Sequence, residues 1–490
     1  MEKIITFLNG ILWSDPVIYL LLGIGVFFTI STRFLQIRHF KEMLYLIFQG
    51  KSSTAGISSF EALSMALSGR VGTGNIAGVA TAIAFGGPGA VFWMWLIAFI
   101  GSASAYIEST LAQIYKIKQD GQYRGGPAYY IEKGLGWKRF AALYAVAAVF
   151  AMTLLMPGVQ SNSIAQSVEM AFHISPVPTG LIIVALLAAV IFGGTQRIAK
   201  TAVVVVPFMA LGYILLAVFI ICMNISELPS VLALIFRSAF AVDSAFGGII
   251  GMAISWGVKR GMYSNEAGQG TGAHAAAAAE VTHPAKQGLV QAFSVYIDTL
   301  FVCSATAFMI LITGMYNTER PDGSFIIQKL SEVEAGPGFT QAAIESTFPG
   351  FGAAFVAAAL FFFAFTTLMA YYYIAETNTI YLLKNRRRSN MLVALKVVFL
   401  AAVFYGAVNE AALAWALGDA GLGITIWINM IAIVFLAKPA LAALKDYEQQ
   451  KRKGLDPVFN PSDLQIKNAD YWESKNLITE DEDFRSKKVD

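Results

Sequence analysis

Two apolar stretches of this sequence carry dense runs of glycine and polar residues in their middle. The first run, 68–75, reads SGRVGTGN, and the second, 255–272, reads SWGVKRGMYSNEAGQGTG. Glycine costs a helix interior about 1 kcal/mol relative to alanine, so both runs favour local unwinding. An unwound segment exposes N–H groups that attract an anion and carbonyl groups that ligate a cation. The two runs therefore predict a binding site built largely from backbone groups.

The overall composition indicates that these runs lie in a membrane protein. Of the 490 residues, 56% are apolar and 14% are charged, against about 45–50% and about 25% in soluble domains. The mean hydropathy is +0.60. A soluble enzyme, a secreted disulfide scaffold and a nucleic-acid-binding protein are all poor fits. The net charge of +3 indicates no polyanionic partner, and two cysteines with four scattered histidines suggest neither a disulfide framework nor a histidine metal site.

Eleven segments are apolar enough to cross a bilayer, which takes about 20 residues per helix. They are 13–32, 57–83, 89–115, 140–160, 178–194, 200–222, 246–275, 287–314, 350–383, 391–408 and 421–444. The expected fold is therefore an all-α polytopic membrane protein with 11 transmembrane helices.

The distribution of basic residues predicts the orientation of these segments. With the N-terminus outside, inside loops and the C-terminal tail hold 27 Lys and Arg, whereas outside segments hold 4. Basic residues concentrate in cytoplasmic loops, so the asymmetry favours an outside N-terminus and a cytoplasmic C-terminus. The outside loop 315–349 is expected to form a partly helical cap, and the tail 445–490 is expected to be solvated.

The positions of the two interrupted segments, 57–83 and 246–275, indicate two inverted halves. They lie five spans apart, and because five is odd, the sets 57–222 and 246–444 have opposite orientation. Glycine-interrupted segments at matching places in inverted halves point to the central site of a transporter. An extra helix with its loop (1–56), an outside connection (223–245) and the tail complete the expected organisation.

A specific motif follows the first run. Residues 86–95 read GGPGAVFWMW and, with 96–101, closely resemble the signature of the sodium:alanine/glycine symporter family. The likeness extends to 33–36, 72–78 and 264–268 and covers residues 13–445. It implies a bacterial or archaeal plasma-membrane protein that couples Na⁺ entry to uptake of alanine or glycine, without an organic cofactor. It also implies a LeuT-like five-plus-five inverted repeat preceded by one extra helix.

A small zwitterionic substrate of that kind needs partners for a carboxylate and an ammonium. We expect the N–H groups near Thr73, Gly74 and Asn75 to hold the carboxylate, because they start the second half of the broken helix. Nearby carbonyls with Asn75 or Gln160 would accept from the ammonium. Trp256 and Gly257 are expected to wall a small apolar pocket, although Trp256 could equally be plain packing.

The carbonyls of Gly69, Val71 and Gly72 end the first half-helix and are candidate Na⁺ ligands. In the five-plus-five fold that the resemblance implies, the eighth core helix faces the first at a sodium site, which adds Thr366 and Thr367. Threonine hydroxyls also bond to the i−4 carbonyl inside membrane helices, so a local role stays open.

Charged residues at membrane depth need partners, because each costs at least about 2.5–3.5 kcal/mol at mid-bilayer. Arg70, Arg260, Glu266 and Glu376 are candidate gating or structural ion pairs, for example Arg260 with Glu266 or Arg70 with Glu376. The sequence does not fix this pairing.

Three other functions compete with a sodium symporter. A proton-coupled amino-acid carrier of the same fold would need a titratable carboxylate near the breaks, and Glu266 is the candidate. An intramembrane enzyme would need a serine–histidine or paired-aspartate site, and His274, near membrane depth, has no obvious serine beside it. A passive channel would not concentrate its substrate.

Overall fold

The computed structural model describes residues 2–50, 52–53, 55–240, 249–331, 333–383 and 388–475. Residues 241–248, 384–387 and 476–490, which belong to the expected connection 223–245, the expected second half 246–444 and the expected tail, lie outside the described residues.

The described chain is almost entirely helical. The helices are α1 (Glu2–Leu12), α2 (Asp15–Ser31), α3 (Leu35–Arg38), α4 (Phe40–Ile47), α5 (Ser59–Arg70), α6 (Val79–Gly86), α7 (Gly89–Ile114), α8 (Pro127–Tyr130), α9 (Lys138–Phe150), α10 (Pro157–Phe172), α11 (Pro176–Ile191), α12 (Thr195–Met223), α13 (Leu228–Ala239), α14 (Ile250–Asn265), α15 (Thr271–Ala278), α16 (Pro284–Val295), α17 (Ser304–Thr313), α18 (Pro337–Thr347), α19 (Gly352–Leu383), α20 (Arg388–Val408), α21 (Ala411–Phe435) and α22 (Ala437–Arg452). Two antiparallel hairpins accompany them, β1 (Ile117–Gln119) with β2 (Gln122–Arg124) and β3 (Asn317–Glu319) with β4 (Phe325–Gln328).

Seven helices of the described residues are long and apolar enough to span a membrane, or eight if the bent pair α1 and α2 forms one span. The protein is thus a polytopic helical membrane protein. Three of the eleven expected segments are not in this count. Segments 57–83 and 246–275 are each broken in the middle. The third, 178–194, corresponds to α11, whose 16 residues are fewer than a membrane-spanning helix usually has.

The breaks fall where the glycine-rich runs predict them. α5 ends at Arg70, and the helix resumes with a π-helical turn, Gly74–Gly78, that leads into α6. α14 ends at Asn265, and α15 begins at Thr271. Between them Gly268 and Gly270 have φ values of +84° and +85°, a region that side chains with a Cβ rarely adopt.

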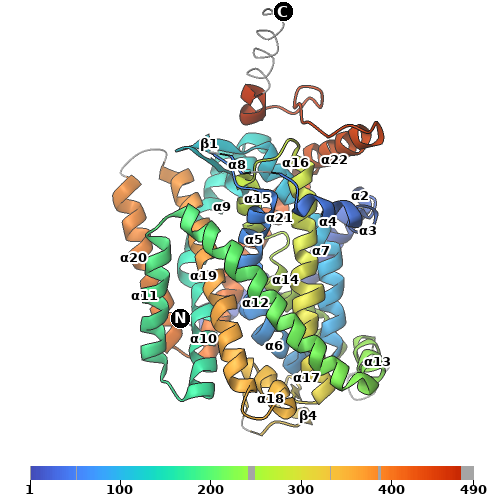
Figure 1. The fold of residues 1–490 in the computed structure, drawn as a ribbon, viewed down its shortest axis with the longest axis vertical. Helices are drawn as coiled ribbons and strands as arrows, with labels where there is room; N and C mark the ends of the chain where they lie inside the picture. The colour runs from blue at the N-terminus through green and yellow to red at the C-terminus, as the bar shows by residue number, and fades with distance from the viewer. Residues whose placement is uncertain are drawn as a thin grey trace, which may run out of the picture.

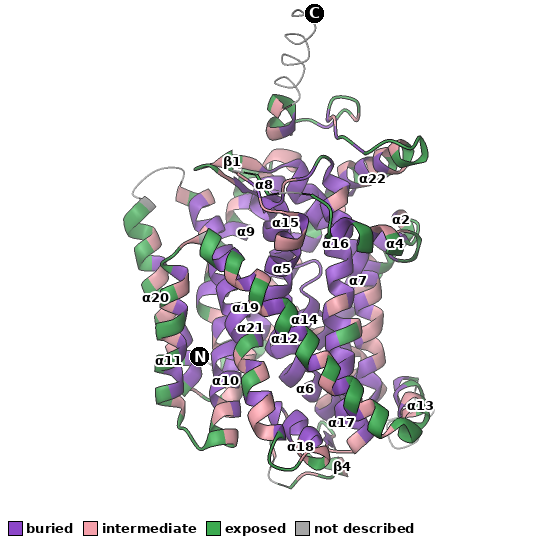
Figure 2. Cartoon of the chain, in the orientation of Figure 1, coloured by how far each residue is buried: buried purple, intermediate pink, exposed green. Residues whose placement is uncertain are grey.

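The helices form a bundle whose two ends differ (Figure 1). α8, the β1–β2 hairpin and α22 lie at one end, called here the α22 end, while α13, α18 and β4 lie at the other, the α18 end. The expected cap 315–349 contains β3, β4 and α18. Buried residues gather along α5, α6, α7 and α14, whereas α11, α12 and α20 expose long faces (Figure 2). These faces are apolar, with Phe208 78% and Val397 57% exposed, as expected for contact with lipid.

The structure corrects the expected tail. Residues from 445 onward are not simply solvated, because α22 runs to Arg452 and the chain then returns along the α22 end. Phe459 and Trp472 are buried there, at 0% and 1% exposure. The composition of this segment is mostly polar, so it does not indicate that two of its aromatic side chains are buried.

Candidate functional site

The first break brings several of the predicted residues together. The N–H of Thr73 donates to Gln160 Oε1 at 3.1 Å, and the N–H of Gly72 donates to Asn75 Oδ1 at 2.8 Å. A Cβ on Gly72 would collide with Thr367 Oγ1 and lie 3.1 Å from Gln160 Oε1. Only glycine therefore allows this close approach of α10 and α19 to the unwound backbone. Side chains satisfy the N–H groups of Gly72 and Thr73 in this arrangement.

The second break is held by carboxylates. Glu266 adopts a left-handed conformation with φ of 53°, and its Oε2 accepts from Thr271 Oγ1 at 2.7 Å. The N–H of Gly270 donates to Glu108 Oε2, on α7, at 3.0 Å. The two breaks are also close to each other, since a Cβ on Gly69 would lie 3.2 Å from Glu266 Oε2.

Asp298 joins the two breaks and is a site residue that the sequence did not assign. Its Oδ1 accepts from Asn75 Nδ2 at 2.6 Å and from Ser264 Oγ at 3.0 Å. Thr299 Oγ1 donates to Oδ2 at 2.7 Å. Asp298, Asn75 and Ser264 are fully buried. The only sequence signal was an acidic residue inside an otherwise apolar span.

The two threonines of α19 have different surroundings. Both hydroxyls donate to the carbonyl of Phe363 at 3.0 Å, which is the local bonding that the sequence left open. Thr367 Oγ1 also faces Gly72 at the first break. The only further contact of Thr366 Oγ1 is with Met209 Sδ at 3.9 Å among the described residues.

Trp256 and Gly257 lie away from the first break. A Cβ on Gly257 would stand 2.5 Å from the carbonyl oxygen of Ala90 and 2.6 Å from Trp93 Cβ, so this glycine lets α14 pack tightly on α7. The Trp256 ring lies 4.8 Å from that of Phe85. These contacts give both residues packing roles in the described conformation.

A buried charge cluster lies on the α18 side of the second break. Asp419 of α21 accepts from Arg260 through both carboxylate oxygens, at 2.8 and 3.2 Å, and from Lys259 Nζ at 2.6 Å. The Arg260 guanidinium lies 4.2 Å from the Trp415 ring centroid and 5.0 Å from that of Trp256. Arg260 therefore pairs with Asp419, on a helix that sequence spacing cannot locate.

Arg70 lies among carboxylates near both breaks. Its Nη1 donates to the Gln291 carbonyl at 3.1 Å and to Ser294 Oγ. The carboxylates that act on it electrostatically are those of Glu108, Glu266 and Asp298. Glu376 is not among them.

Glu376 instead interacts with Tyr372, one turn away on α19. The pairings offered as examples from the sequence, Arg260 with Glu266 and Arg70 with Glu376, are thus both replaced by others.

The cluster around Arg70 holds three carboxyl groups and one guanidinium. Glu108, Glu266 and Asp298 share one arginine, and all are at most 1% exposed. Glu108 Oε2 accepts from the Gly270 N–H and from Asn429 Nδ2. Glu108 Oε1 and Glu266 Oε1 have no hydrogen-bond partner within the described residues. Since uncompensated buried charge is costly, the site favours a bound cation or proton.

Comparisons with known proteins agree with this architecture. The model of the sodium:alanine symporter family matches residues 1–461. The protein YrbD of Bacillus subtilis (strain 168) is 72% identical over 475 residues, covering 97% of this chain and 98% of its own. The sodium/proton-dependent alanine carrier protein of Bacillus sp. (strain PS3) is 57% identical over 433 residues, covering 88% and 97%.

A solved structure shares the fold at low sequence identity. The crystal structure of an Eremococcus coleocola manganese transporter aligns with a TM-score of 0.51 and 10% identity, covering 86% of this chain and 94% of that chain. At this identity the likeness concerns the fold alone.

Proposed function

Because the chain belongs to the sodium:alanine symporter family, a family of transporters and not of enzymes, we propose that it takes up alanine or glycine by symport with Na⁺. The observation that carries this proposal is the meeting of two broken helices at Asn75, Ser264 and Asp298. Broken helices with buried polar groups at such a junction are typical of secondary transporters.

The substrate would bind at the start of the second half of the first broken helix. Its carboxylate would take the N–H groups at Thr73, Gly74 and Asn75, displacing Gln160 Oε1 from the Thr73 N–H. Gln160 and Asn75 would then accept from the ammonium. A Cβ on Gly74 would lie 3.0 Å from Ser264 Cα, so a glycine here lets the two broken helices approach closely beside the proposed substrate site.

Sodium would bind beside it, where α5 ends. The carbonyls of Gly69, Val71 and Gly72, the last of which accepts from the Asn75 N–H at 3.2 Å in this conformation, would supply oxygens. The hydroxyls of Thr366 and Thr367 on α19 would complete the set. Thr367, whose oxygen faces Gly72, has the better position. Trp256 and Gly257 would contribute to the substrate pocket only if α14 moved during the transport cycle.

The proposed Na⁺ and substrate sites use the same unwound backbone, and this arrangement would couple the binding of the two ligands. Each Na⁺ driven by 100 mV supplies about 2.3 kcal/mol from voltage. Na⁺ and amino acid can share that energy only if both stabilise the same state. Ligands on either side of residues 71–73 would order the same unwound turn. Arg260 with Asp419 would close the α18 end in this state, and Arg70 with Glu266 would lie nearer the α22 end.

We extend the proposal to eleven spans in a five-plus-five inverted repeat after one extra helix. The broken pairs α5–α6 and α14–α15, together with α11, would supply the three spans beyond the eight that length and composition support. The repeats would cover 57–222 and 246–444. The 27-to-4 asymmetry of basic residues supports a plasma-membrane protein with the α22 end cytoplasmic and the N-terminus outside.

Proton coupling is a second candidate, favoured by the excess of carboxylates around Arg70. Glu266, and Glu108 with its second oxygen unpartnered, could carry a proton in place of a bound cation. The name of the relative from Bacillus sp. (strain PS3) includes both ions.

Uptake into proteoliposomes tests the proposal. We expect saturable, concentrative uptake of radiolabelled alanine driven by a Na⁺ gradient at fixed pH. Gly72→Ala should abolish it, since the new Cβ meets Thr367 and Gln160. Gly212→Ala on α12 is the matched control, because its Cβ meets nothing within 4 Å. Uptake indifferent to Na⁺ but driven by a pH gradient would favour the proton carrier, and non-saturating flux would indicate a channel.

A further inference from the structure

The chain after α22 crosses the α22 end as a segment, called here the C-terminal strap (453–475), that is irregular to residue 469 and helical from residue 470. Near its start, Asp456 accepts from Lys286 Nζ of α16 at 2.5 Å. The Phe459 N–H then donates to the Thr282 carbonyl at 3.0 Å, and Thr282 Oγ1 donates to the Pro457 carbonyl at 2.8 Å. The strap therefore pairs through its backbone with the loop 279–283, which connects α15 to α16.

Two buried aromatic side chains anchor the strap. Trp472 Nε1 donates to the carbonyl of Gln113, in the last turn of α7, at 2.8 Å. The Phe459 ring lies 5.2 Å from that of Trp472 and 5.4 Å from that of His283. Burial of apolar side chains is the main favourable term in contacts of this kind. These anchors join the strap to α7 and to the loop 279–283.

Lys116, just beyond α7, is enclosed by the strap. Its Nζ donates to the Ala279 carbonyl at 2.9 Å and lies 4.3 Å from the Tyr123 ring, 4.7 Å from Tyr471 and 5.3 Å from Trp472. Two of these three rings belong to the strap. The cage thus links the strap, the β1–β2 hairpin and the end of α15.

The loop beneath the strap also joins the two broken helices. The Ile57 N–H donates to the Ala278 carbonyl at 3.0 Å, and the Glu280 N–H donates to the Ile57 carbonyl at 2.8 Å. Ile57 lies two residues before α5, and Ala278 is the last residue of α15. This backbone bridge ties together the outer ends of the two half-helices that meet at the candidate site, and it closes the α22 end between them.

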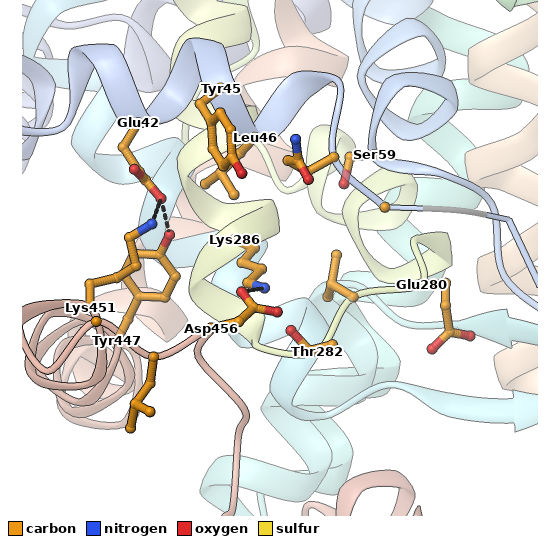
Figure 3. Close-up of a pocket in the computed structure, with 15 residues that line it drawn as sticks. Glu42, Tyr45, Leu46, Ser59, Glu280, Thr282, Lys286, Tyr447, Lys451 and Asp456 are labelled. Carbon is orange, nitrogen blue, oxygen red and sulfur yellow. Dashed lines mark hydrogen bonds and ion pairs between the residues drawn. The ribbon is translucent and has the colours of Figure 1, made fainter.

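The buried residues Phe459, Ala469 and Trp472 of the strap belong to the same hydrophobic core as the bundle helices, whereas the first residues of the strap stand apart from the bundle. A cavity of about 700 Å³ lies between its first residues and the bundle, lined among others by Tyr447, Lys451, Asp456, Ser59 and Lys286 (Figure 3). Figure 3 shows the Lys286–Asp456 pair crossing between the bundle and the strap. The strap thus contacts the bundle through its buried residues and through polar contacts such as Lys286 with Asp456, with a cavity beside its first residues.

We propose that the C-terminal strap is a latch: docked, it holds the backbone bridge of Ile57 with 278–280 closed, and its release permits the α22 end to open. The inference rests on the proposed transport function for its biological meaning, but the contact itself can be tested without transport. For the α22 end to open, α15 must part from α5. The loop 279–283 cannot follow α15 while the strap and Lys116 hold it.

Cysteine accessibility measures the latch directly. Ser64, buried on α5 beyond the bridge, is replaced by cysteine in a chain with Cys222→Ser, and labelling by a membrane-impermeant maleimide is followed in nanodiscs. Trp472→Ala and Phe459→Ala should each speed labelling of Ser64→Cys at least about tenfold, as a tenfold change in an opening equilibrium does. Val458→Ala is the matched control, because Val458 neighbours Phe459 but is 57% exposed, and its rate should stay within about twofold.

A variant of an exposed strap residue tests whether faster labelling comes from weaker docking and not from misfolding. Asp470→Lys opposes Lys133, with which Asp470 pairs at its largely exposed side chain, and should speed labelling less than the aromatic variants do. Alanine-dependent thermal protection of each variant checks that the site is intact. Equal labelling rates in Trp472→Ala, Phe459→Ala and Val458→Ala would overturn the latch. Faster labelling without any alanine uptake by the unmodified chain would instead reject the transport function and leave the latch standing.

Discussion

The charge cluster of Arg260, Lys259 and Asp419 predicts an asymmetry between two substitutions that look alike. One buried carboxylate faces two cations, with side-chain exposures of 4%, 3% and 16% for Asp419, Arg260 and Lys259. Asp419→Asn leaves both cations without a counter-charge. Arg260→Met leaves Lys259 paired with Asp419 at 2.6 Å, a neutral pair.

The expected magnitudes differ accordingly. Removing one partner of a buried ion pair and leaving the other uncompensated costs about 3–5 kcal/mol, so Asp419→Asn should destabilise the protein by about that amount. Arg260→Met loses the stacking on Trp415, worth about 0.5–2 kcal/mol, while the methionine keeps most of the buried volume. We therefore expect Arg260→Met to cost about 1–2.5 kcal/mol less than the low end of the Asp419→Asn range.

Thermal unfolding in detergent, followed by loss of the monodisperse peak in size-exclusion chromatography, measures this difference. Asp419→Asn should have the lower melting temperature, and Asp419→Asn with Arg260→Met should recover part of the loss because only Lys259 then stays uncompensated. A lower melting temperature for Arg260→Met than for Asp419→Asn would refute the charge-balance reasoning.

Two further predictions concern the proposed sodium site and the strap. Thr367→Val should raise the Na⁺ concentration for half-maximal alanine uptake about tenfold or more, with a smaller rise in Thr366→Val, because only the Thr367 hydroxyl faces Gly72; equal effects would contradict this placement. Burial lowers the pKa of Lys116 from 10.5 to about 7 when the strap is docked, against the attraction of Glu280. The undocked state therefore binds more protons between pH 7 and 10.5, so docking tightens as pH rises through that window. The labelling rate of Ser64→Cys, divided by the rate for free cysteine at each pH, should fall from pH 7 to pH 9. The same ratio should stay constant over this pH range when Lys116→Met is added. An unchanged fall in that variant would exclude Lys116 as the cause of the pH dependence.

Local features of the fold could be read from the sequence. The helix breaks were predictable, because glycine next to polar groups inside an apolar span is a local signal. Apolar length and basic loops likewise predict a polytopic helical protein. The seven or eight spans that pass by length and composition fall short of eleven mainly at these same breaks, where the criterion of one continuous helix fails.

Pairings between distant elements could not be read in this way. Arg260 and Asp419 are 159 residues apart, and nothing in either neighbourhood specifies the other. Asp298 was visible as a buried acid, but its bonds to Asn75 and Ser264 depend on how three helices cross. The docking of Trp472 likewise depends on a carbonyl at Gln113 that only the folded α7 presents.

The two ends of the bundle are held by different chemistry, and this difference matters for the proposed transport cycle. Bidentate charge pairing between α14 and α21 would close the α18 side of the breaks, whereas a backbone bridge beneath an aromatic strap would close the α22 end. Alternating access requires that one end open while the other stays closed. If both ends depended on one cluster, a ligand that loosened it would open a channel. Since the breaks at 71–73 and 266–270 lie between the two closures and share Asp298 and Arg70 as neighbours, ligand binding there can bias one closure without directly removing the other.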